Sequence, residues 1–140
     1  ADHNRSGAYE VDFSDKVDRR HATLESVRYA IETEDRAALM DSLILCKFLR
    51  GVFTDFYAEA ADMLARVTGW DVTAEELRET ARRIVAAKRQ FNVMAGWTPE
   101  EDTLPDRFLD TPLPTDPAAM LTRERLRELV AEYHRQRGWG

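Results

Sequence analysis

Apolar residues recur along this chain with the spacing of an α-helix, and the strict alternation typical of β-strands is scarce. Leu24, Val27 and Ile31, for example, lie three and seven positions apart and would share one face of a helix. Patterns of this kind predict helices over about 21–32, 37–50, 54–67, 74–90 and 122–137. The sequence therefore predicts an all-α fold, a helical bundle of about five helices.

Local signals mark where these helices begin and end. The polar run Thr33–Asp35 separates the first two helices, and Gly51 and Gly69 follow the next two, as glycine often does at a helix end. Thr73, followed three residues later by Glu76, has the pattern of a capping box and predicts the start of the fourth helix.

Two segments lack the helical period. Residues 1–20 are expected to form a loop lead-in, and all five prolines fall within residues 95–120. Proline has no backbone N–H and disrupts helix interiors, so this second segment is predicted to be a Pro-rich irregular arm. We expect residues 1–140 to form a single helical domain. The chain opens without an initiator Met, which suggests a segment of a longer protein.

Composition narrows the class of protein. The 140 residues are 44% hydrophobic and 33% charged, which is typical of a globular domain. A net charge of −6, with basic residues spread among acids, argues against a nucleic-acid partner. No apolar run is long enough to span a membrane. The one cysteine excludes an internal disulfide and is compatible with a reducing compartment, so we expect a cytoplasmic protein.

That cysteine, Cys46, lies in an apolar run that also contains one carboxylate, Asp41. Burying a carboxylate without a partner is unfavourable. If the run is helical, Asp41 shares a face with Ile44 and Leu45, and Cys46 lies about a turn and a half further on. An acid and a thiol on one element indicate a bound group. The alternative is a core helix in which Cys46 is a small hydrophobic residue and Asp41 caps a neighbour.

Other common site patterns are missing from the sequence. It has no Gly-rich phosphate loop, no nucleophile elbow and no paired His or Cys spacing for a metal. His21 and His134 lie beside arginines on faces predicted to contact solvent. His3 belongs to a dense polar cluster that is either a functional loop or a frayed terminus.

Four segments, in order, resemble motifs of the aldehyde:ferredoxin oxidoreductase family. Ala1–Ser6 resembles the continuation of its Arg-Gly-Ala-Asp-His segment, and Asp41–Cys46 resembles its Asp-x-x-Gly-Leu-Cys motif. Arg89–Asn92 is similar to its Arg-x-Phe-Asn stretch, and Glu101–Phe108 is similar to its Asp-Asp-Thr-Leu-Pro-x-Arg stretch. The similarity spans essentially the whole chain, which would then be the C-terminal part of a larger oxidoreductase.

The resemblance implies an enzyme with a tungsten (or molybdenum) bis-pterin and a [4Fe–4S] cluster. It would oxidise an aldehyde substrate to a carboxylic acid and pass electrons to ferredoxin or another electron-transfer subunit. By this resemblance Cys46 is the fourth thiolate ligand of the cluster. The other three ligands would come from the N-terminal portion of the same enzyme, because one sulfur cannot hold a four-iron cluster.

The resemblance also implies roles for other residues. Asp41 would accept hydrogen bonds from the pterin, which Leu45 would approach, and His3 would lie near the metal in proton transfer or substrate orientation. Arg5 would set a cation against the pterin phosphate or ring. Ile44 departs from the family pattern, which has glycine there. A stand-alone helical interaction domain, without a metal or a catalytic role, is the alternative.

Overall fold

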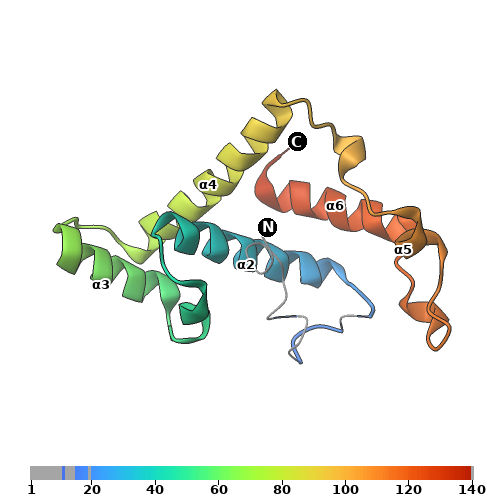
Figure 1. Ribbon diagram of the computed structural model, residues 1–140, viewed down its shortest axis with the longest axis horizontal. Helices are drawn as coiled ribbons and strands as arrows, with labels where there is room; N and C mark the ends of the chain where they lie inside the picture. The colour runs from blue at the N-terminus through green and yellow to red at the C-terminus, as the bar shows by residue number, and fades with distance from the viewer. Residues whose placement is uncertain (1–10, 12–14, 19, 140) are drawn as a thin grey trace. The chain divides into compact units, whose positions relative to one another are not determined.

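The computed structural model describes residues 11, 15–18 and 20–139 of the chain (Figure 1). Within these residues the α-helices are α2 (Leu24–Ser42), α3 (Phe56–Thr68), α4 (Ala74–Met94), α5 (Asp106–Asp110) and α6 (Arg123–Arg137). Short 3-10 helices lie at η1 (Lys47–Gly51), η2 (Pro99–Glu101) and η3 (Pro117–Ala119). The described ranges contain no β-strand. The predicted all-α class is confirmed.

The chain divides into two compact units. Of the described residues, the first unit contains 32–95, and the second contains the segment up to Ile31 together with 96–139. The expectation of one domain over residues 1–140 stays a prediction. None of the described helices has the length and apolar character needed to cross a membrane.

Helix α2 differs from the two helices predicted for its region. It runs without a break through Thr33–Asp35, so the predicted separation there is wrong. These residues disfavour a helix only slightly. Packing outweighs that preference, since Asp35 is buried, with 7% of its surface exposed. The helix also ends at Ser42 rather than near Gly51. This earlier end separates Asp41 from Cys46, as described below.

The core of the first unit forms where the second half of α2 meets α3 and α4. Its buried members are Leu39, Met40, Phe56, Ala60, Ala61, Leu77 and Ala81. Ala60 and Ala81 are fully buried on α3 and α4, which contact each other, and small side chains let two helix backbones approach closely. Val67 follows the predicted apolar stripe of α3 but is 84% exposed, because the buried residues of α3 all lie in its first two turns.

The capping box predicted for α4 is present. The Glu76 backbone N–H donates to Thr73 Oγ1 at 3.2 Å, and the Thr73 backbone N–H donates to Glu76 Oε2 at 2.7 Å. The hydrogen bonds from Thr73 lower the pKa of Glu76. They also satisfy two of the amide groups that a helix start leaves without partners. Helix α4 therefore begins where the sequence predicts and continues a turn further than predicted, to Met94.

The Pro-rich arm is more regular than predicted, since η2, α5 and η3 lie within it. Pro99 and Pro117 stand at the first positions of η2 and η3, where a missing N–H leaves no helical bond unmade. Arg123 of α6 donates to Asp106 at 2.8 Å and to Asp110 at 2.6 Å. Its guanidinium therefore fastens both ends of α5 to the start of α6.

A partly buried tyrosine in the first unit gives the fold a pH dependence. Burial, and then the nearby Asp35 carboxylate, raise the pKa of Tyr57 to about 12, while the Arg78 guanidinium lies 4.9 Å from its ring centroid. The unfolded chain loses this proton near pH 10.

The folded state therefore holds a proton between pH 10 and about 12 that the unfolded state has lost, and stability must fall as pH rises through this window. We expect Tyr57→Phe to show a smaller loss of unfolding free energy across the window than the unmodified chain. Urea unfolding at several pH values between 9 and about 12 checks this. If the unfolding free energy fell equally steeply with pH in both chains, this expectation would be contradicted.

Candidate functional site

Three of the five predicted site residues lie together at the end of α2. Asp41 is in the last turn of the helix, and Leu45 and Cys46 follow it in the connection to η1. The prediction that one continuous helix carries both the acid and the thiol is wrong. His3 and Arg5 lie outside the described residues.

The end of α2 has the hydrogen-bond pattern of a Schellman motif. The Leu45 N–H donates to the Met40 carbonyl at 3.0 Å, and the Ile44 N–H donates to the Asp41 carbonyl at 3.0 Å. This pattern requires a left-handed conformation at the first of these two donor residues along the chain, and Ile44 has φ of 58°. The position is the one where the resembling family motif has glycine. Glycine would adopt this left-handed conformation without steric cost, whereas Ile44 adopts it at a steric disadvantage.

We expect Ile44→Gly to raise the free energy of unfolding by about 1 kcal/mol. A β-branched residue in the left-handed region is disfavoured by about 1–2 kcal/mol, and the greater freedom of glycine in the unfolded chain offsets part of the gain. The Ile44 side chain is 92% exposed, so little packing is lost. Urea unfolding measures the change. Ile44→Ala is the matched control, because alanine still has a Cβ and should gain much less.

Cys46 presents its thiol to solvent. It is an exposed free cysteine with an extended backbone (φ −61°, ψ 128°). Its carbonyl accepts the first hydrogen bond of η1, from the Leu49 N–H at 2.9 Å. It is thus not the buried small hydrophobic residue of the alternative interpretation. Its sulfur is open to ligands from outside the first unit.

Asp41 occupies a position that local helix energetics disfavour. A carboxylate in the last turn of a helix faces the negative end of the helix dipole, and the last turn of α2 has no basic residue. The residue is half-buried. Residues that break a local rule are often found at functional sites, so this placement is consistent with a site at the helix end.

Leu43 and Leu45 pack against the core of the first unit, whereas their neighbours do not. Ile44, Phe48 and Val52 are 92%, 88% and 68% exposed. Exposed apolar residues therefore lie close to Cys46 in the sequence, on both sides of it. A concentration of exposed apolar residues is typical of an interaction surface.

The two other histidines have acidic partners in the second unit. His21 Nδ1 lies 2.7 Å from Asp18 Oδ2, and this hydrogen bond raises the pKa of His21 and lowers that of Asp18. His134 Nε2 lies 3.3 Å from Asp102 Oδ2, and the His134 side chain is only 19% exposed. The prediction that His134 faces solvent is therefore wrong, because it joins α6 to the segment with the Asp-Thr-Leu-Pro motif.

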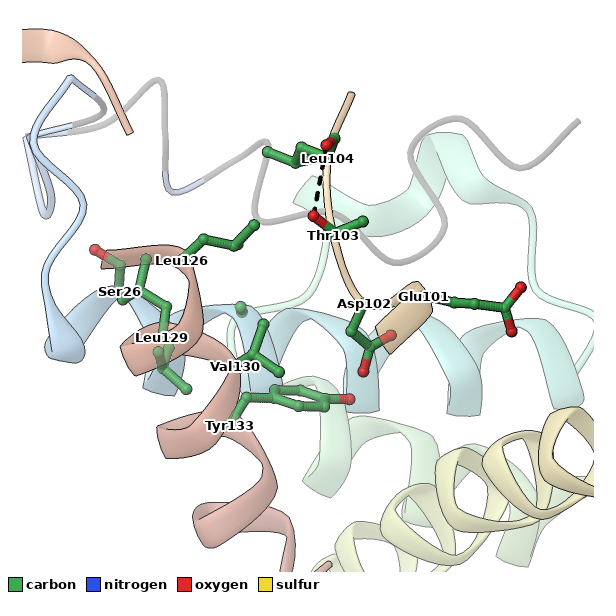
Figure 2. A pocket seen from close by; sticks show the side chains of 11 residues that line it. Ser26, Glu101, Asp102, Thr103, Leu104, Leu126, Leu129, Val130 and Tyr133 are labelled. Atoms are coloured by element: carbon green, nitrogen blue, oxygen red, sulfur yellow. Dashed lines mark hydrogen bonds between the residues drawn. The ribbon is translucent and has the colours of Figure 1, made fainter. Parts of the chain in front are cut away.

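The second unit also contains a pocket of about 490 Å³ (Figure 2). Figure 2 shows Leu126, Leu129, Val130 and Tyr133 of α6 on one side and Asp102–Leu104 of the arm on the other. Its walls are mostly apolar, and Asp41, Leu45 and Cys46 do not line it. The pocket and the end of α2 are thus separate features, each within its own unit.

The residues at the end of α2 fit the role of one donor to an iron–sulfur cluster. In the part of the chain that the structure describes, no three His, Cys, Asp or Glu side chains are grouped closely enough to hold a metal ion. A four-iron cluster needs four ligands, usually thiolates, and the exposed sulfur of Cys46 can supply one while leaving room for the others.

Sequence reasoning missed Arg36, whose guanidinium donates to the Arg50 carbonyl oxygen just beyond Cys46. No local pattern signals a contact between residues that are 14 positions apart. It also missed the left-handed Ile44, for which the glycine of the resembling motif was the available signal.

Comparison with known proteins agrees with the motifs. The family model described as "Aldehyde ferredoxin oxidoreductase, domains 2 & 3" matches residues 1–140. The chain is 38% identical over 126 residues to the tungsten-containing aldehyde ferredoxin oxidoreductase of Pyrococcus furiosus. Its identity to the proteins of the same name is 38% in Thermococcus kodakarensis and 37% in Pyrococcus horikoshii.

In each of the three cases the match covers 89% of this chain and 20% of the relative. The chain thus spans about a fifth of the length of these relatives. The family model, in contrast, matches the chain from end to end. The chain belongs to the aldehyde ferredoxin oxidoreductase family of oxidoreductases, and its match falls within domains 2 and 3 of that family.

Proposed function

We propose that this chain is the C-terminal portion of a tungsten-pterin (or molybdenum-pterin) enzyme that oxidises aldehydes to carboxylic acids and transfers electrons through a [4Fe–4S] cluster. The observation that carries the proposal is the exposed Cys46 thiol, held on an ordered helix end five residues after Asp41. The family match over the whole chain supports it. The tungsten-containing relatives are the reason to prefer tungsten.

When bound, the pterin metal would supply the two-electron oxidation of aldehyde and water, and the cluster would supply single-electron transfer. Cys46 would hold one cluster iron through its thiolate. Because Leu45 is fixed to α2 by a backbone hydrogen bond and by core packing, the adjacent sulfur would be presented from a rigid support.

Asp41 would bind the pterin. Its carboxylate can accept hydrogen bonds from ring N–H and amino groups, and such charge-assisted bonds are stronger than neutral ones. Donors brought by the pterin would also offset the unfavourable helix dipole at this position. Leu45 would contribute the part of its side chain that core packing leaves accessible.

His3 and Arg5 keep the roles that the family motif assigns. His3 would move a proton at the substrate or orient the aldehyde, since an imidazole can do both near neutral pH. Arg5 would pair with the pterin phosphate through its guanidinium.

The N-terminal portion of the same enzyme would complete the site. It would bring the remaining cluster ligands and cover the exposed Ile44, Phe48 and Val52 around Cys46. Ferredoxin or another electron-transfer subunit would then receive the electrons. The match to only a fifth of each relative is consistent with such a division.

Elemental analysis of the intact protein that carries this chain tests the proposal. We expect about four iron atoms and about one tungsten or molybdenum per chain, together with aldehyde-dependent reduction of ferredoxin or an artificial acceptor. An intact protein that is folded but lacks iron and both metals would contradict the proposal. That result would favour the stand-alone helical interaction domain instead.

A further inference from the structure

The backbone that carries Cys46 is tied to α2 on its upstream side. The Leu45 N–H donates to the Met40 carbonyl at 3.0 Å, and the Leu45 side chain packs against the core of the first unit. The Leu43 N–H donates to the Leu39 carbonyl at 2.9 Å. The residue immediately before the thiol is therefore fixed, but this anchor alone leaves the following segment free to pivot.

Downstream of Cys46 the chain forms η1, a 3-10 helix of five residues. The Leu49 N–H donates to the Cys46 carbonyl at 2.9 Å, and the Val52 N–H donates to the Leu49 carbonyl at 3.0 Å. The last carbonyl groups of any short helix lack partners within the helix. The Arg50 carbonyl is one of these, because it lies in the final turn of η1.

Arg36 supplies the partner for that carbonyl. Its Nη2 group donates to the Arg50 carbonyl oxygen across 14 residues of sequence. The Arg36 guanidinium is itself held in place, since its central carbon lies 5.4 Å from the ring centroid of Phe56, a core residue of α3. A charged donor on helix α2 thus forms a hydrogen bond with the C-terminal end of η1, the helix that follows Cys46.

We infer that Arg36 is a positioning residue for Cys46, and that it fixes the thiol for cluster binding by anchoring the end of η1 to α2. The inference rests on the proposed function for the cluster. With Leu45 fixed on one side and Arg50 on the other, the Cys46 backbone is held at both ends while its sulfur remains exposed. A ligand held in this way needs no reordering when the other donors arrive.

The test uses the intact enzyme with Arg36→Met, which keeps a long apolar side chain but removes the donor. We expect faster amide hydrogen exchange in the peptide that contains Leu49 and Val52, whose N–H groups depend on η1. We also expect about tenfold faster release of iron to a chelator, in line with the effect of losing groups that orient a metal ligand. The EPR spectrum of the reduced cluster should change as well.

Three further variants separate positioning from general destabilisation. Arg36→Lys keeps one charged donor, so its iron release should be slower than that of Arg36→Met. If Arg36→Met does not fold, Arg36→Lys takes its place in the comparison with the unsubstituted enzyme. Arg50→Gln keeps the backbone carbonyl that Arg36 binds but removes the hydrogen bond that the Arg50 guanidinium donates to the Lys47 carbonyl at 3.4 Å, and it should speed iron release less than Arg36→Met does. Arg82→Met removes an exposed arginine of α4 that pairs with Glu79 at 3.4 Å, and should alter neither iron release nor exchange near Leu49.

The outcomes distinguish this inference from the proposed function. The inference alone would be overturned if folded Arg36→Met showed unchanged amide hydrogen exchange at Leu49 and Val52. It would also be overturned if that exchange changed while iron release and the EPR spectrum did not. Full retention of the cluster after Cys46→Ser would overturn the proposed function. Local exchange that rises near η1 but not elsewhere, with partial rescue by lysine, would support the inference.

Discussion

Replacing Cys46 with serine in the intact enzyme is expected to abolish the proposed iron–sulfur cluster while leaving the helices folded. The residue is exposed, so the substitution should have little effect on stability. A serine hydroxyl is a poor ligand for cluster iron, and three remaining thiolates hold a [4Fe–4S] cluster weakly. Iron should fall well below the proposed content of about four atoms per chain.

Iron and sulfide analysis, EPR of the dithionite-reduced protein and circular dichroism check this result together. A control variant keeps one thiol in this region but places it at a different position. The double variant Cys46→Ser, Ser42→Cys places a cysteine at another exposed position of the same helix end, in the last residue of α2. We expect no recovery of iron, because a ligand must be fixed within a fraction of an ångström. Normal iron content in Cys46→Ser would contradict the proposed role of this residue.

Leu39→Ala is expected to reduce the free energy of unfolding of the first unit by about 2–5 kcal/mol. Leu39 is 2% exposed in the core between α2, α3 and α4, and its truncation leaves a cavity that close-packed neighbours fill only in part. The loss is a large share of the stability of a domain of this size. The same core supports Leu45, so the end of α2 next to Cys46 should loosen as well.

Urea denaturation followed by circular dichroism measures the loss. Val67→Ala is the matched control, because Val67 is apolar but 84% exposed, and we expect a change within about 0.5 kcal/mol. A loss below about 1 kcal/mol for Leu39→Ala would mean that the core is not closely packed around this residue.

The helices themselves could be predicted from the sequence for physical reasons that are local. The period of apolar residues, the Thr73–Glu76 capping box and the glycine after α3 act within a few residues, and the structure places α3, α4 and α6 within a few residues of the predictions. The resemblance of four motifs also predicted the family, which the whole-chain match confirms. Asp41 and Cys46 were found as candidates because a lone acid and a lone thiol stand out in an apolar run.

The geometry of the candidate site depended on tertiary structure. The polar run Thr33–Asp35 predicted a break, but packing of the surrounding helix buried Asp35 and kept α2 continuous. No glycine marks the end of α2, so the residue types did not predict the left-handed conformation of Ile44. As a result Asp41 lies in α2, whereas Cys46 lies at the start of η1. The anchor from Arg36 to the Arg50 carbonyl joins positions that only the folded chain brings together. Sequence by itself determines where most of the helices form, because the apolar period, the caps and the helix-ending glycine act over only a few residues. The position of the thiol is decided by contacts between distant residues, whose free energy exists only once the core has formed.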